Sequence, residues 1–218
     1  MTSSTAEVPV RIKPLETGAV LGQTMALVAL TTGLFALGAF LGRNTSGGWA
    51  IAWFVAALAI LLSLNVVAQR SEQLAVGLLF GFGLLLGLAV APAIAGYASA
   101  DPRALWEAGG ATGLFIAGVG AVGYATRRDL AGIARASFWV LVGLIAFGIV
   151  LVFVQIPSGA LVYSVLGLVV FAGLTLYDFQ RLRQTNDIRS APQLAASIFL
   201  DALNVFLLLL SLFGGEER

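Results

Sequence analysis

The sequence predicts an all-α membrane protein built as a bundle of seven transmembrane helices, and three observations predict it. The chain of 218 residues is 59% hydrophobic and only 11% charged, whereas a soluble domain carries about 25% charged residues. Its apolar residues fall into stretches of about 20, the length that crosses about 30 Å of hydrocarbon. The breaks between these stretches are short and polar, so no water-soluble domain fits between them.

The chain divides into two short tails and one transmembrane domain. Residues 1–16 contain charged side chains and two prolines but no apolar core of a signal peptide, so we expect a polar tail there. A single domain of seven spans is expected over 17–214, followed by a short tail at 215–218. The expected spans are 18–41, 49–68, 74–97, 108–126, 134–154, 159–180 and 193–213.

Polar breaks and small residues define the first four spans. The first ends before GRNTSGG, the second ends before QRSE, and YASADPRALWE separates the third from the fourth. The third and fourth spans are rich in glycine, which lets helices approach closely in a membrane. We interpret these glycines as packing positions and not as a phosphate-binding loop, since no strand precedes them and no lysine follows; they are Gly81, Gly83, Gly87, Gly109, Gly110, Gly113, Gly118, Gly120 and Gly123.

The last three spans follow the same pattern. TRRDLAGIAR precedes the fifth span, and RLRQTNDIRSAPQ joins the sixth to the seventh. The segment QIPSG between the fifth and sixth spans carries no charge, as expected for a tight turn on the translocated side. Since the sixth and seventh spans are joined by a short loop, we expect them to be antiparallel neighbours.

The basic residues predict the orientation in the membrane, because Lys and Arg accumulate on the cytoplasmic side. With seven spans, one side carries nine basic residues and the other carries three. This predicts a multi-pass protein with its N-terminus in the cytoplasm and its C-terminus outside. The side with nine holds Arg11, Lys13, Arg70, Arg127, Arg128, Arg135, Arg181, Arg183 and Arg189, and the other holds Arg43, Arg103 and Arg218.

Composition also excludes several classes of function. The net charge of +1 argues against a nucleic-acid partner. The chain has no Cys and no His, which removes zinc sites, haem ligation by His, Ser-His-Asp triads and Cys nucleophiles. Because no nucleophile and base are arranged together, we expect no enzymatic activity and no resident cofactor. The expected surroundings of the chain are the lipid bilayer.

Two aspartates inside the last two expected spans are the leading candidates for a functional site. Asp178 and Asp201 would lie at bilayer depth, where a carboxylate costs about 3 kcal/mol or more on insertion scales. Asp201 lies on the polar stripe of its helix with Ser197 and Asn204, at spacings of four and three residues. Such a stripe should face the bundle interior, because lipid offers no hydrogen-bonding partners.

The sixth span carries a similar stripe. Its members recur at helical spacing and end at Asp178; they are Tyr163, Ser164, Gly167, Phe171, Leu174 and Asp178. If the two carboxyl groups meet, they cannot easily both ionise, and they titrate as a unit. Their oxygens would also attract Ca²⁺, but two carboxylates are too few for a tight site, so we expect transient cation passage.

Each of these residues also has a structural interpretation. Asp178 could be a membrane-edge residue paired with Arg181. Asp201 could accept a helix–helix hydrogen bond from Asn204 or a neighbouring hydroxyl. Asn204 could serve packing alone, and Arg70 could be a positive-inside anchor instead of a latch on the carboxylate pair.

The last two spans resemble the Bax inhibitor family, the transmembrane Bax-inhibitor-motif proteins. The resemblance rests on two segments, Val162-Tyr163-Ser164-x-x-Gly167-x-x-x-Phe171-x-Gly173-Leu174-x-x-Tyr177-Asp178-x-Gln180 and Phe199-Leu200-Asp201-x-x-Asn204-x-Phe206. It implies a seven-helix bundle with the C-terminal helix at the centre. It also implies a di-aspartyl proton sensor, here Asp178 and Asp201, and an arginine at the inner end of the second helix that interacts with it, here Arg70.

The resemblance implies a function as well. Members of the family are described as pH-sensitive calcium leak channels, so protons and Ca²⁺ are the expected partners. Some bacterial relatives bind a membrane-embedded protease, and animal relatives suppress cell death. The short C-terminal tail lacks the basic extension of eukaryotic members, which favours a bacterial plasma membrane.

The sequence therefore predicts a passive, pH-gated cation leak channel with Asp178 and Asp201 as the titrating pair and Arg70 as the latch. Two alternatives stay open. A proton-coupled transporter would need a substrate pocket and often has internal repeats, which seven spans do not supply. A non-transporting regulator that binds a membrane protease or another partner would show no flux at any pH.

Overall fold

The structure is a computed structural model that describes residues 15–45, 47–154 and 156–214. Within these ranges the chain forms seven α-helices and two short 3-10 helices, and no strand. The all-α prediction is therefore confirmed. The elements are α1 (Leu15–Leu41), η1 (Gly42–Asn44), α2 (Gly47–Ala68), α3 (Glu72–Ala100), α4 (Pro102–Ala125), α5 (Ala131–Phe153), α6 (Gly159–Gln184), η2 (Ile188–Ser190) and α7 (Ala191–Phe213).

Six of the described helices are long and apolar enough to cross a membrane. In α2 the apolar stretch is shorter and covers Gly48–Leu64. The expected count of seven spans is thus supported for six helices and stays a prediction for α2. The charged tail residues Arg11, Lys13 and Arg218 lie outside the described residues.

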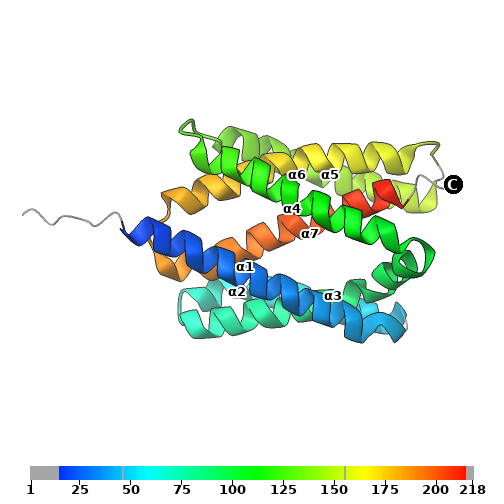
Figure 1. Cartoon of the computed structure of the whole chain (residues 1–218), viewed down its shortest axis with the longest axis horizontal. Helices are drawn as coiled ribbons and strands as arrows, with labels where there is room; N and C mark the ends of the chain where they lie inside the picture. Colours follow the sequence, from blue (N-terminus) through cyan, green and yellow to red (C-terminus); the bar gives the residue numbers. More distant parts are fainter. Residues whose placement is uncertain (1–14, 46, 155, 215–218) are drawn as a thin grey trace, which may run out of the picture.

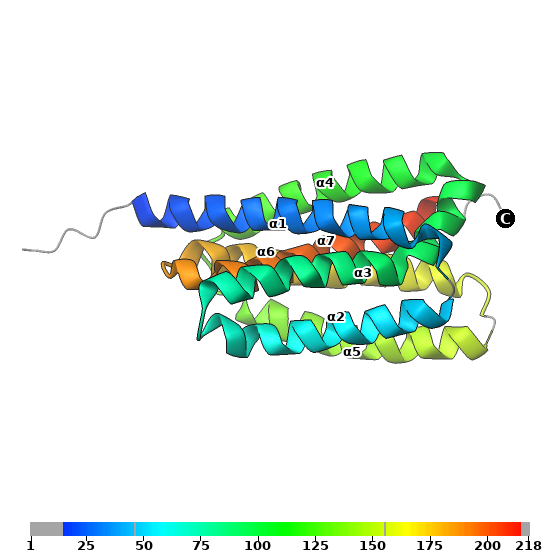
Figure 2. The same ribbon diagram turned by 90° about the horizontal axis from the view of Figure 1, so that it is seen from below.

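The helices lie in two groups that α7 joins (Figure 1 and Figure 2). In the first group α3 contacts both α1 and α2, and in the second group α6 contacts both α4 and α5. The C-terminal helix α7 contacts α1, α2 and α3 of the first group and α4 and α6 of the second. Half of the residues in the apolar window of α7 are buried, the largest share among the six candidate spans.

Glycines let α1 and α3 pack with their backbones almost in contact. A Cβ atom on Gly83 would lie 2.8 Å from the carbonyl oxygen of Thr31, and one on Gly87 would overlap the carbonyl oxygen of Phe35. From the α1 side, a Cβ on Gly38 would overlap the backbone of Leu84. This seam confirms the packing interpretation for Gly83 and Gly87.

The glycines of α4 divide into two sets. Gly120 and Gly123 face α6, where added Cβ atoms would lie 2.8 Å from the Phe179 ring and from Leu176 Cα, respectively. The others, Gly109, Gly110, Gly113 and Gly118, would have no atom within 4 Å of an added Cβ. For these four the expected packing role is wrong, because all four positions are exposed and no other helix approaches them.

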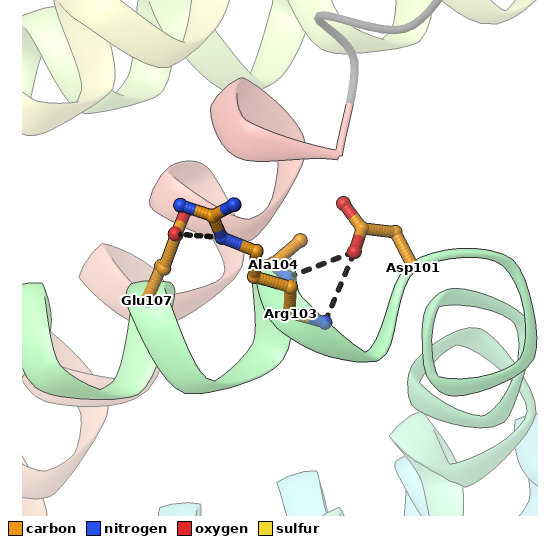
Figure 3. A network of polar contacts seen from close by, with 4 residues as sticks. All are labelled: Asp101, Arg103, Ala104 and Glu107. Carbon is orange, nitrogen blue, oxygen red and sulfur yellow. Dashed lines mark hydrogen bonds and ion pairs between the residues drawn. The ribbon is translucent and has the colours of Figure 1, made fainter.

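Side-chain caps fix where α3 and α4 begin. The hydroxyl of Ser71 accepts a hydrogen bond from the backbone N–H of Leu74 at 3.4 Å. The carboxylate of Asp101 accepts from Arg103 N at 3.0 Å and from Ala104 N at 3.3 Å (Figure 3). These bonds satisfy backbone N–H groups that have no partner within the helix.

Candidate functional site

The structure brings Asp178 and Asp201 together inside the bundle. Helices α6 and α7 are in contact and run in opposite directions, as expected (Figure 1). Only 6% of Asp178 and 5% of Asp201 are exposed. The two carboxyl groups lie close enough for the charge of one to act on the other.

Each carboxyl group is hydrogen-bonded by a hydroxyl group from the opposite helix. Thr175 Oγ1 of α6 donates to Asp201 Oδ2 of α7 at 3.1 Å. In the reverse direction, the Ser197 hydroxyl of α7 hydrogen-bonds the carboxyl group of Asp178 on α6. The spacing explains this crosswise arrangement, because Thr175 precedes Asp178 by three residues and Ser197 precedes Asp201 by four, so each hydroxyl shares a helix face with an acid.

Thr175 is the partner that sequence reasoning missed. It is fully buried, and its hydroxyl donates the only interhelical bond to Asp201 that is described. The signal was present, because a hydroxyl three residues before a buried acid lies on the same face of the helix. The bond also fits the alternative interpretation of Asp201 as the acceptor of an interhelical hydrogen bond, and the two interpretations differ in whether the pair titrates.

Arg181 is the cation that acts on the pair in this structure. It lies one turn beyond Asp178 and interacts electrostatically with its carboxyl group, as in the membrane-edge interpretation. Its side chain is exposed. Arg181 and Ser197 also line a cavity of about 180 Å³ with Leu61 of α2 and Gln193 of α7. The cavity therefore lies between the exposed Arg181 side chain near the end of α6 and the Ser197 hydroxyl that hydrogen-bonds Asp178.

Arg70 occupies a different place. It lies in the exposed turn between α2 and α3 and lines a polar cavity of about 300 Å³ with Glu72 and Arg189. No interaction described for this chain joins Arg70 to Asp178 or Asp201. The latch stays a prediction, and in this conformation Arg70 is an exposed basic residue at the end of a helix.

The other predicted supporting residues fall into two classes. Ser197 contacts the pair directly. Asn204 Nδ2 donates to the carbonyl oxygen of Leu200 in its own helix at 2.8 Å, which fits its packing interpretation. Tyr163 packs against the Phe147 ring, with centroids 6.5 Å apart, and it precedes Asp178 by fifteen residues, or about 22 Å along the helix.

Gln180 anchors the end of α6 that carries the site. Its Oε1 accepts from Leu130 N at 3.0 Å, and its Nε2 donates to the carbonyl oxygens of Thr126 and Arg128. One turn later, Arg183 donates to the carbonyl oxygen of Tyr124 at 2.8 Å. These bonds tie the loop between α4 and α5 to α6 and so hold the helix that presents Asp178.

The carboxyl pair offers a small set of donors for a cation. Among the described residues no group of three or more His, Cys, Asp or Glu side chains could hold a metal ion. The pair offers two carboxyl groups, and its two hydroxyl groups already hydrogen-bond them. Calcium takes six to eight oxygen ligands, so a tight calcium site cannot be built from these residues alone.

Comparison with known proteins gives one family and several relatives. The family model described as inhibitor of apoptosis-promoting Bax1 matches residues 17–218. The inner membrane protein YbhL of Escherichia coli is 31% identical over 180 residues, which cover 77% of this chain and 75% of YbhL. An uncharacterised protein of Deinococcus radiodurans is 30% identical over 173 residues, covering 75% of this chain and 73% of that protein.

Proposed function

Because the chain belongs to the Bax inhibitor family, we propose that it is a pH-sensitive passive leak channel for calcium or a similar cation. Asp178 and Asp201 would form its titrating pair. The observation that carries the proposal is their crosswise bonding within the bundle, where each acid is held by a hydroxyl of the other helix.

The physical argument starts from the cost of the arrangement. A charged carboxyl group at bilayer depth is expensive, and two within reach of each other titrate as a unit. Proton uptake by the pair removes the negative charge that faces Arg181. A two-state protein responds to such a loss by shifting its closed–open equilibrium. The cavity that reaches Ser197 is partly lined by α2, so we propose α2 as the element whose position responds.

The predicted latch enters this scheme as a second conformation. Arg181 faces Asp178 in the structure described here, whereas Arg70 lies in the turn at the end of α2. Arg70 would act as a latch when this end of α2 approaches the pair.

The surrounding architecture follows from the same premise. We propose seven spans with α7 at the centre, a cytoplasmic N-terminus and an external C-terminus, in a bacterial inner membrane. The contacts of α7 with five other helices support its central place, and the name of the relative YbhL, an inner membrane protein, supports the choice of membrane. The proposed role is passive transport and not catalysis.

Flux measurements in proteoliposomes test the proposal. Purified protein is reconstituted around a calcium indicator, and calcium entry is recorded between about pH 6 and pH 8. We expect wild-type flux to depend on pH and the Asp178→Asn and Asp201→Asn variants to lose that dependence, since an amide does not titrate in this range. Asp129→Asn is the matched control, because Asp129 is exposed and its only described hydrogen bond is one it accepts from the backbone N–H of Ala131 at the start of α5.

Three results would contradict the proposal or redirect it. Wild-type pH dependence in both aspartate variants would remove the pair as the sensor. Accumulation of calcium against its gradient would indicate a coupled transporter, and no flux at any pH would indicate a non-transporting interaction protein. In the same assay Arg181→Gln should alter the pH response, and an equal effect of Arg70→Gln would support the latch.

A further inference from the structure

A groove on the outside of the bundle offers a second site, independent of the carboxyl pair. It follows α7 between α1 and α4 and continues between α1 and α3; α7 crosses behind the space between α1 and α4 in Figure 1. Two adjoining cavities of about 260 and 620 Å³ form it. Phe35, Ala36 and Phe206 line both cavities, so the two are continuous. We call this the α1–α4 groove.

The α1–α4 groove is apolar and opens on the side of the helix bundle. Ala36 of α1 and Gly109 of α4 line it and are exposed. An added Cβ on Gly109 would have no atom within 4 Å, so the space beside this glycine is open. For a membrane-spanning protein the surroundings at this depth are hydrocarbon, and the larger cavity has the size of pockets that take small organic ligands, about 300 to 1,000 Å³.

A basic residue stands at one end of the groove. Arg43 and Asn44 of η1 line the larger cavity, and the Arg43 guanidinium lies 4.0 Å above the Phe40 ring. Stacking on an aromatic ring leaves the guanidinium N–H groups at its edge available to an anion.

The other charges described at this end of the bundle already have partners. Asp101 caps the first turn of α4, and Arg103 forms an ion pair with Glu107 at 2.6 Å (Figure 3). No described acidic side chain pairs with Arg43. This end of the α1–α4 groove therefore carries a positive charge with no described acidic partner, directly beside the apolar part of the groove.

We propose that the α1–α4 groove binds one anionic phospholipid, with an acyl chain along α7 and the phosphate on Arg43 and Asn44. The apolar floor and the single cation match the two ends of such a molecule. The site is separate from the proton sensor, because its lining residues Phe199 and Leu203 are each two positions from Asp201 and so lie on roughly the opposite side of α7.

Native mass spectrometry of the full chain in detergent tests the site. The probes are phosphatidylglycerol and phosphatidylcholine with identical acyl chains. We expect wild-type protein to retain one phosphatidylglycerol about tenfold more tightly than phosphatidylcholine. Arg43→Gln should abolish this preference, whereas Arg127→Gln, which removes an exposed charge elsewhere, should keep it.

Filling the groove tests the acyl chain. Ala36→Trp should lower retention of both lipids about tenfold, and Ala95→Phe, which fills the larger cavity, should do the same if Ala36→Trp fails to fold. Ala146→Trp, on an exposed face of α5, is the size-matched control and should retain both lipids. Equal retention of the two lipids by wild type, or unchanged retention in a folded groove variant, would overturn the proposal and indicate annular lipid or another occupant.

Discussion

At the scale of single residues, the site is defined by which hydroxyl serves which acid. Thr175 and Ser197 each hydrogen-bond the carboxyl group of the opposite helix. Both carboxyl groups are buried, so a missing partner costs more than the bond itself contributes. The two hydroxyl groups therefore couple the positions of α6 and α7 to the state of the acids.

Removing the Thr175 hydroxyl should destabilise the protein. Thr175→Val keeps the shape but leaves Asp201 Oδ2 without its donor, so we expect the free energy of unfolding to fall by about 1 to 3 kcal/mol. Thr175→Ser keeps the donor and should recover most of this loss. Unfolding by sodium dodecyl sulphate in mixed micelles measures both.

Thr32→Val is the matched control for this prediction. Thr32 is exposed, and its hydroxyl bonds only the carbonyl oxygen of Val28 in its own helix, so the change should cost less than about 0.5 kcal/mol. An equal loss in Thr32→Val and Thr175→Val would show that the bond to Asp201 contributes nothing specific.

The candidate site shows what residue patterns can predict. The 3-and-4 spacing on the last two helices placed Asp178, Ser197 and Asp201 on inward faces because lipid cannot satisfy polar side chains. That constraint does not set the rotation of one helix against its neighbour. The pairing of Thr175 with Asp201 depends on that rotation and could not be predicted from spacing. The approach of Arg181 to Asp178 lies within one helix, and the three-residue spacing did predict it.

At the scale of elements, small residues control how closely the helices approach. The seam between α1 and α3 has Gly83 and Gly87 on one side and Gly38 on the other, with backbone against backbone. Lipid tails are as apolar as leucine, so association in a membrane depends on such close packing. The open glycines in the first half of α4 show the opposite case. No helix packs against them, because this half of α4 is separated from α1 by the α1–α4 groove.

A single methyl group should distinguish packed from open glycines. In Gly87→Ala the new Cβ meets the backbone of Phe35 and lies 2.9 Å from Ala39 N, so we expect a loss of about 2 kcal/mol as α1 is pushed away. Gly113→Ala meets no atom within 4 Å and should gain about 0.5 to 1 kcal/mol through helix propensity. The free energy of unfolding of both variants is measured under the same conditions. A loss of stability in both would contradict the packing argument.

At the scale of the whole molecule, the sequence predicted the elements better than their arrangement. The expected spans lie within the observed helices to within a few residues, because bilayer thickness imposes a length on every span. The division into two groups bridged by α7 rests on contacts between distant segments. A membrane span is apolar both where it faces lipid and where it faces another helix. Its hydrophobic pattern therefore says little about which helices are its neighbours.

Orientation and span count can be tested together, because the chain has no cysteine and single cysteines report on one position each. Gly48→Cys and Gln69→Cys stand at opposite ends of α2, and both positions are exposed. If α2 crosses the membrane and the basic residues set the orientation, a membrane-impermeant maleimide added to intact spheroplasts should label Gly48→Cys and spare Gln69→Cys until the membrane is opened.

Each other outcome of this labelling has a definite meaning. The reverse pattern would overturn the predicted orientation but keep α2 as a span. Labelling of both positions, or of neither, in intact spheroplasts would place the two ends of α2 on one side and reduce the bundle to the six spans that length and hydropathy support. In that case α2 would be a helix lying against α3, and its proposed movement at the carboxyl pair would no longer be the motion of a transmembrane element.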